Sequence, residues 1–144
     1  MGGLLIISGS KNSLPVLMEL FKQTDYSQIE STHDSFEARR LLSMSFDLVL
    51  INAPLQNESG IELALDAAGA GSSVIMLIKS ESCDEIAQRV EASGVLVVPK
   101  PLNRVLFYQA LHLINASRRQ FMRLKSENER LQEKIAEIRL VDRA

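Results

Sequence analysis

The sequence predicts an α/β fold, a doubly wound five-stranded parallel sheet, followed by an extended C-terminal coiled-coil helix. Three features predict it: short apolar runs, segments of helical spacing between them, and a final stretch without Gly or Pro. The runs do not alternate with polar residues, so both faces of each strand should be covered, which is typical of parallel sheets. Right-handed crossovers then place helical layers on both sides of the sheet.

Four continuous apolar runs and one weaker segment account for the strands. The weaker segment surrounds Ile29, where polar residues interrupt the pattern. In chain order, the expected strands are residues 4–7, 27–32, 48–51, 74–78 and 95–98.

Apolar residues at helical spacing predict a helix after each strand. The first begins after Ser13 as N-cap, with Pro15 in its first turn. Its apolar stripe comprises Val16, Leu17, Leu20 and Phe21. The next helices are expected over residues 34–44, 60–68 and 83–92, and the fifth starts after Asn103.

Composition limits the chain to one compact domain with an appendage. It has 144 residues, of which 46% are hydrophobic, enough for a single sizeable core. Residues 1–117 hold 8 basic and 13 acidic side chains, whereas residues 118–144 hold 8 and 5, so an acidic body precedes a basic tail. A lone Cys83, no signal peptide and no long apolar run predict a cytoplasmic protein without a membrane partner.

In such a sheet, functional residues gather beyond the carboxyl ends of the central strands. Three segments of the sequence resemble the receiver domain of bacterial response regulators. They are Asp47 to Asn52, Gly60 to Leu63 eight residues later, and Lys100-Pro101 after the last strand. The resemblance covers about residues 3–117. It implies a flavodoxin-like fold with strand order 2-1-3-4-5, and a role in the phosphorelay of two-component signal transduction.

The phosphorylation site of that family is degenerate in this chain. Active members use an Asp acceptor after the third strand, an acidic pair that holds Mg²⁺ after the first, a Thr or Ser after the fourth, and a Lys. Only the Lys is matched, at Lys100. Asn52 stands at the acceptor position, where an amide is no nucleophile. Ser8 and Gly9 replace the acidic pair and Ile78 the hydroxyl, with Ser80 as an alternative for the last.

We therefore expect a pseudo-receiver that is not an enzyme and has no catalytic residue, metal or cofactor. Three alternatives remain open for the pocket. Asn52 also suits a strand-end turn in an unrelated flavodoxin-like fold, and Lys100 also suits a solvated surface position. A small anion or a partner loop could occupy the pocket.

Other reactive residues do not form a recognisable site. His33 and His112 have no further ligand at metal-binding spacing. Cys83 precedes Asp84 and Glu85, whose charges should raise the pKa of its thiol.

From Arg104 to about Val141 the chain has neither Gly nor Pro, which predicts a helix of roughly 38 residues, about 57 Å long. Its first part carries two apolar lines, and only one of them can face the sheet. They comprise Leu106, Ala110, Leu113 and Ser117 on one line, and Phe107, Leu111 and Ile114 on the other.

Residues 118–144 are expected to form a coiled coil. Its heptads place Phe121, Asn128 and Ile135 at a, and Leu124, Leu131 and Ile138 at d. A single Asn at an a position favours a parallel homodimer, because it pairs best with its own copy. Against this, Lys134 at g and Arg139 at e would repel one another across the dimer. The alternative is a helix folded back on its own domain.

A degenerate receiver, a coiled linker and the ending from Ile138 to Ala144 together look like ANTAR-type response regulators. Their helical module binds nascent RNA and prevents transcription termination. The resemblance implies control of an RNA-binding antitermination output by a module that continues past Ala144, with a regulatory protein partner upstream. Basic residues from Arg118 to Lys125 could touch nucleic acid, but acidic neighbours favour a solvated coil face. The first rival hypothesis is an interaction scaffold without nucleic-acid output. The second is an enzyme or a still-phosphorylated receiver, which the missing nucleophile predicts to be wrong.

Overall fold

The computed structural model describes residues 2–143, with side chains described for residues 2–138. Contacts between Cα atoms divide the chain into two units, Met1–Ala110 and Leu111–Ala144. The first unit contains the sheet, and the second is helical throughout its described part.

The first unit is built on a five-stranded sheet in which all neighbouring strands are parallel. The strand order β2-β1-β3-β4-β5 is the order that the receiver resemblance implies. The strands are β1 (Gly3–Ser8), β2 (Gln28–Thr32), β3 (Leu48–Asn52), β4 (Ser73–Lys79) and β5 (Leu96–Lys100).

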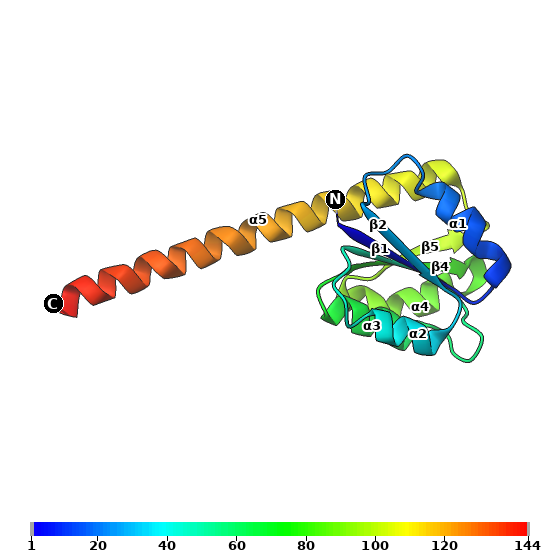
Figure 1. Ribbon diagram of the computed structural model, residues 1–144, viewed down its shortest axis with the longest axis horizontal. Helices are drawn as coiled ribbons and strands as arrows, with labels where there is room; N and C mark the ends of the chain where they lie inside the picture. The colour runs from blue at the N-terminus through cyan, green and yellow to red at the C-terminus, as the bar shows by residue number, and fades with distance from the viewer. Residues whose placement is uncertain (1, 144) are drawn as a thin grey trace. The chain divides into compact units, whose positions relative to one another are not determined.

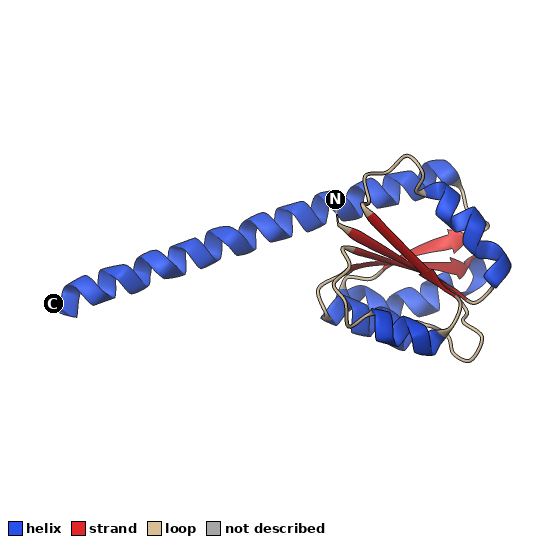
Figure 2. Cartoon of the chain, in the orientation of Figure 1, coloured by secondary structure: helices blue, strands red, loops and turns tan. Residues whose placement is uncertain are grey.

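Helices cover both faces of the sheet. As Figures 1 and 2 show, α2, α3 and α4 lie on one face, and α1 with the first residues of α5 lies on the other. The helices are α1 (Leu14–Leu20), α2 (Ser35–Leu41), α3 (Ile61–Gly69), α4 (Cys83–Val90) and α5 (Arg104–Arg143), with short 3-10 turns at Lys11–Ser13, Ser80–Ser82 and Glu91–Ser93. This arrangement confirms the predicted doubly wound fold.

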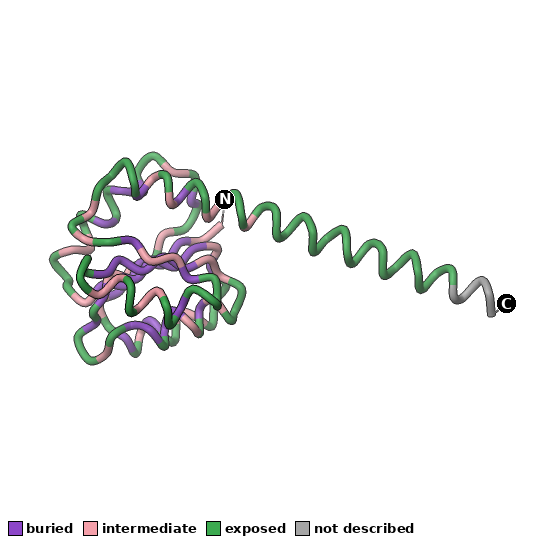
Figure 3. Tube along the Cα trace, turned by 180° about the vertical axis from the view of Figure 1, so that it is seen from behind, coloured by how far each residue is buried: buried purple, intermediate pink, exposed green. Residues whose placement is uncertain are grey.

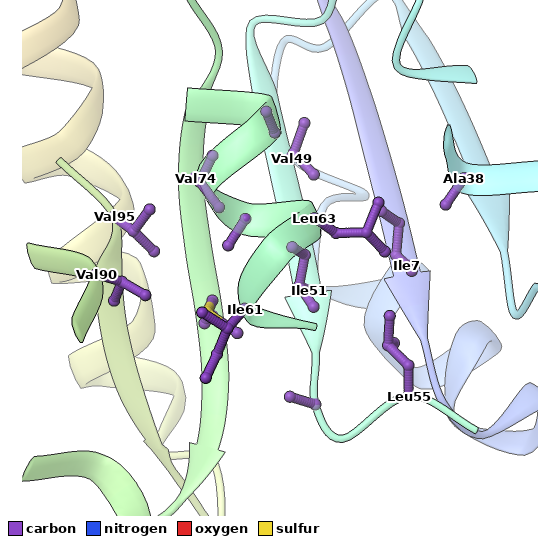
Figure 4. Close-up of a cluster of buried hydrophobic side chains, with 14 of the residues drawn as sticks. Ile7, Ala38, Val49, Ile51, Leu55, Ile61, Leu63, Val74, Val90 and Val95 are labelled. Atoms are coloured by element: carbon purple, nitrogen blue, oxygen red, sulfur yellow. The ribbon is translucent and has the colours of Figure 1, made fainter. Parts of the chain in front are cut away.

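The core consists of two apolar layers, one on each side of the sheet. On one side, aliphatic side chains of β1, β3 and β4 pack against α2, α3 and α4 (Figure 4). On the other side, the rings of Phe21 and Phe107 meet edge to face at a centroid distance of 5.7 Å. The Tyr108 hydroxyl donates to the Leu20 carbonyl over 2.6 Å. The first residues of α5 are therefore part of the domain core.

The ends of the first two helices differ in detail from the prediction. Ser13 stands at the N-cap of α1, but its side chain makes no capping hydrogen bond. Val16 is 63% exposed, because the buried stripe runs through Leu17, Leu20 and Phe21 instead. Helix α2 ends at Leu41 rather than near Met44, and turn hydrogen bonds continue the chain from there.

Helix α5 is uninterrupted, as predicted, and its 40 residues make it slightly longer than the expected helix from Arg104 to about Val141. Of the two apolar lines, Phe107 and Leu111 are buried, whereas Leu106 and Leu113 are exposed. The described heptad positions of the second unit are all exposed in the single chain, from Phe121 to Ile138 (Figure 3). The side chains of Arg139 and of the ANTAR-like ending up to Ala144 lie outside the described residues.

No described helix combines the length and the apolar character that crossing a lipid bilayer would need.

Candidate functional site

The three strand-end positions singled out from the sequence lie at one edge of the sheet. Ser8, Asn52 and Lys100 are the last residues of β1, β3 and β5. Ser8 is in direct register with Asn52. Because parallel strands end on the same edge, residues far apart in sequence meet there.

Hydrogen bonds join these three side chains into a continuous chain. The Lys100 Nζ donates to Asn52 Oδ1 over 2.9 Å and to the Ala53 carbonyl over 2.6 Å. Asn52 Nδ2 donates to Ser8 Oγ over 3.1 Å. Ser8 Oγ in turn donates to the Ser10 carbonyl and accepts from its amide. Both ends of the Asn52 amide therefore have partners.

The chain of hydrogen-bonded side chains contains a positive charge and no carboxylate. Its charged group is Lys100, whose pKa is lowered by burial and then by the charge of Lys79. Among the described residues, no three His, Cys, Asp or Glu side chains gather where they could hold a metal ion, and this applies to His33 and His112 as well. A hard divalent cation prefers carboxylate oxygens, which the residues at these strand ends do not supply.

Of the two candidates for the hydroxyl position, Ile78 lies within β4 and Ser80 follows it directly. The Ile78 side chain is 3% exposed and belongs to the core cluster under the sheet edge. The Ser80 hydroxyl donates to the backbone carbonyl of Lys100 over 2.7 Å. Ile78 therefore lies in the core, and Ser80 is hydrogen-bonded to the backbone of β5.

Gly9 lies directly under the loop that joins β3 to α3. A Cβ added to Gly9 would overlap the Pro54 carbonyl oxygen and would lie 3.0 Å from the Leu55 Cα. Real Cβ atoms essentially never approach so closely, and backbone atoms cannot rotate away. The space that an acidic side chain at this position would need is thus filled by main chain. Sequence reasoning missed this loop contact, because glycine permits a close backbone approach without indicating which segment approaches it.

Cys83 is separate from this site. Its thiol is close to the carbonyl oxygens of Ile78 and Lys79, at 3.5 and 3.4 Å. The pKa of the thiol is raised, as expected, but burial is the first cause and the charges of Asp84 and Glu81 follow. From the sequence, the charge of Glu85 was expected to raise this pKa as well, but Glu85 is not among the causes, so that expectation was wrong. A raised thiol pKa argues against nucleophilic chemistry here.

Comparison with known proteins gives structural matches alone. No protein-family model matches the sequence, and no curated protein matches it. Among solved structures, a receiver domain protein described as CheY-like from Methanospirillum hungatei JF-1 superposes with a TM-score of 0.72 at 18% identity, covering 83% of this chain and 98% of that one.

Two further matches have the same character. A two component transcriptional regulator AraC from Clostridium phytofermentans ISDg has a TM-score of 0.72 at 18% identity, covering 83% of this chain and 97% of that one. The signal receiver domain of an HD domain-containing protein from Pseudomonas fluorescens Pf-5 has a TM-score of 0.71 at 20% identity, covering 84% of this chain and 91% of that one. The fold is that of response regulator receiver domains.

The receiver fold does not by itself define an activity. A structure described as adenylate cyclase from Rhodopirellula baltica also matches, with a TM-score of 0.71 at 18% identity over 90% of this chain and 96% of that one. Function therefore has to be argued from the site that the receiver fold carries.

Proposed function

We propose that this chain is a pseudo-receiver: a cytoplasmic regulatory module of signal transduction that has the receiver fold and does not take up a phosphoryl group. The observation that carries the proposal is the Asn52 amide, which is hydrogen-bonded to both Lys100 and Ser8. This amide stands at the end of β3, where the receiver resemblance implies a carboxylate acceptor.

Each step of phosphoryl transfer lacks its chemical group here. An amide oxygen is a poor nucleophile and does not form the acyl phosphate that a carboxylate forms. The transferred phosphoryl group also needs a divalent cation to neutralise its developing charge, and Ser8 and Gly9 provide no carboxylate for one. The hydroxyl of Ser80 is already donated to the β5 backbone.

The direct test is incubation of the chain with acetyl phosphate and Mg²⁺, followed by intact mass spectrometry. We expect no phosphoryl adduct. A response regulator known to autophosphorylate under the same conditions serves as the positive control. An adduct that peptide mapping assigns to the first unit would refute the proposal.

We further propose that the second unit forms a parallel homodimer through its heptad seam. The large apolar side chains at its a and d positions are between 50% and 64% exposed in the single chain. They are Phe121, Leu124, Leu131, Ile135 and Ile138. Exposed apolar residues at a 3.5-residue repeat are buried most simply against a second copy of the same helix.

Asn128 decides the orientation of the two helices. In a parallel pair, its amide faces the Asn128 amide of the second copy. An antiparallel pair places each a residue of one helix opposite a d residue of the other. Asn128 then faces Leu131 of the second copy, and its buried amide has no partner, at a cost of about 1–3 kcal/mol for each copy.

Surface charges act in the opposite direction but more weakly. The antiparallel pair would bring Glu127 close to Lys134 of the second copy, and the parallel pair would bring Lys134 close to the Arg139 position. Exposed ion pairs of this kind contribute only about 0.3–0.5 kcal/mol each. The Asn128 pair therefore outweighs them and favours the parallel dimer.

Sedimentation equilibrium tests the dimer. We expect a mass of twice the 16.0 kDa of the chain at micromolar concentration. A monomer at high micromolar concentration would remove the dimer from the proposal and leave the pseudo-receiver intact.

For the output, we propose control of RNA-binding antitermination through an ANTAR-type module downstream of α5. The support is the sequence resemblance of the ending from Ile138, together with a helix that continues without a break to Arg143. The test is RNA binding by a protein that carries residues beyond 144, compared with this chain alone. Absence of RNA binding by the longer protein would favour an interaction scaffold.

A further inference from the structure

The loop between β3 and α3, residues 53–60, makes close backbone contact with Gly9. A Cβ at Gly9 would overlap the Pro54 carbonyl oxygen, and it would be 3.0 Å from the Pro54 carbonyl carbon. The next residue, Leu55, is 6% exposed and belongs to the core cluster. Figure 4 shows its side chain near the carboxyl ends of β1 and β3. The loop is therefore packed down on the site, not suspended above it.

Two sets of polar contacts hold the loop from opposite sides. On the α2 side, the Arg39 guanidinium donates to both carboxylate oxygens of Glu58, over 2.8 and 2.9 Å. Glu58 is tied back to the buried part of the loop, because its carbonyl accepts from the Leu55 amide over 2.8 Å. On the β5 side, Lys100 donates to the Ala53 carbonyl. A two-bond Arg–carboxylate pair fixes orientation better than a single contact does.

We infer that the Arg39–Glu58 pair acts as a clamp that keeps the loop of residues 53–60 closed over Gly9, so that backbone fills the place of the second acidic side chain. This deepens the proposed pseudo-receiver and rests on it. The backbone of the loop then excludes a metal-binding side chain from position 9, in addition to the absence of an acidic residue there. Replacing residues at positions 8 and 52 would leave the obstruction in place.

The clamp is tested by hydrogen exchange at the Leu55 amide, whose partner is the Glu58 carbonyl. We expect Arg39→Leu to raise its exchange rate about fivefold, which is the effect of losing one well-oriented ion pair on a local opening. The matched control is Lys22→Leu, which removes the ion pair between Glu19 on α1 and Lys22 just after this helix, 3.6 Å long and far from the loop in sequence. That variant should leave Leu55 exchange unchanged. Equal rates in wild type and Arg39→Leu would refute the clamp.

A double-mutant cycle provides a second, independent measurement. Gly9→Ala should lower the urea midpoint of unfolding less in the Arg39→Leu background than in wild type, because a released loop can move away from the new Cβ. In the Lys22→Leu background, the loss should equal that in wild type. The same loss in all three backgrounds would refute the inference. A phosphoryl adduct on the wild-type chain would instead refute the proposed function and leave these results standing.

Discussion

Gly9→Ala provides a quantitative test of how firmly the loop of residues 53–60 closes the sheet edge. The added Cβ would overlap the Pro54 carbonyl oxygen and press on the Leu55 Cα. Overpacking of a well-packed site costs about 1–3 kcal/mol. Alanine recovers about 0.5 kcal/mol by restricting the unfolded chain. We therefore expect a net loss of about 0.5–2.5 kcal/mol in the free energy of unfolding.

Urea denaturation followed by far-UV circular dichroism measures this loss. With an m-value of about 1.5 kcal/mol/M for a domain of this size, the midpoint should fall by about 1 M. The matched control is Gly69→Ala at the end of α3, where an added Cβ meets no atom within 4 Å. Its midpoint should stay the same or rise, because Ala is the better helix former. Equal midpoints for Gly9→Ala and wild type would refute the close packing of the loop.

Three further substitutions test the site and the helix. Lys100→Met removes the amine that joins β5 to β3 and should cost about 1 kcal/mol at neutral pH. Burial and the Lys79 charge lower the pKa of Lys100 in the folded state. The stability advantage of the wild type over this variant should therefore grow as the pH rises through that lowered pKa. Equal differences in urea midpoint at pH 7 and about pH 10 would contradict this. Asn128→Val should tighten association about tenfold and permit antiparallel or larger assemblies in sedimentation experiments, so weaker association would contradict the Asn128 pair. Lys134→Glu should strengthen a parallel dimer by relieving repulsion, whereas weaker association would indicate the antiparallel pair with Glu127.

The fold could be predicted from sequence because the strands are uninterrupted apolar runs. Leu4 to Ile7 and Leu48 to Ile51 are fully buried, as two-sided coverage requires. Boundaries were less predictable where tertiary contacts decide them. Val95 is apolar and buried, yet β5 begins one residue later and includes Pro99 and Lys100. Val16 has the spacing of the α1 stripe, but it lies at the margin of the buried face.

The candidate site was predictable in its members but not in its connections. Strand-end positions follow from the parallel topology, so Ser8, Asn52 and Lys100 could be named in advance. That Asn52 uses both ends of its amide could not be read from the sequence, because it depends on side-chain distances. The Arg39–Glu58 pair spans 19 residues and two elements, with no motif to indicate it. Gly9 permits a close backbone approach, but the residue alone does not indicate that Pro54 and Leu55 are the ones that approach it.

The same topology that would gather carboxylates in an active receiver here gathers groups that satisfy one another. Carboxylates gathered at one site repel one another, and a bound cation relieves that repulsion. An amide between a lysine and a serine needs none, and no side-chain nitrogen or oxygen buried in the described residues lacks a partner. The proposed pseudo-receiver would then receive its signal through a contact made on its surface or through the proposed dimer, rather than through phosphorylation at the β3 strand end.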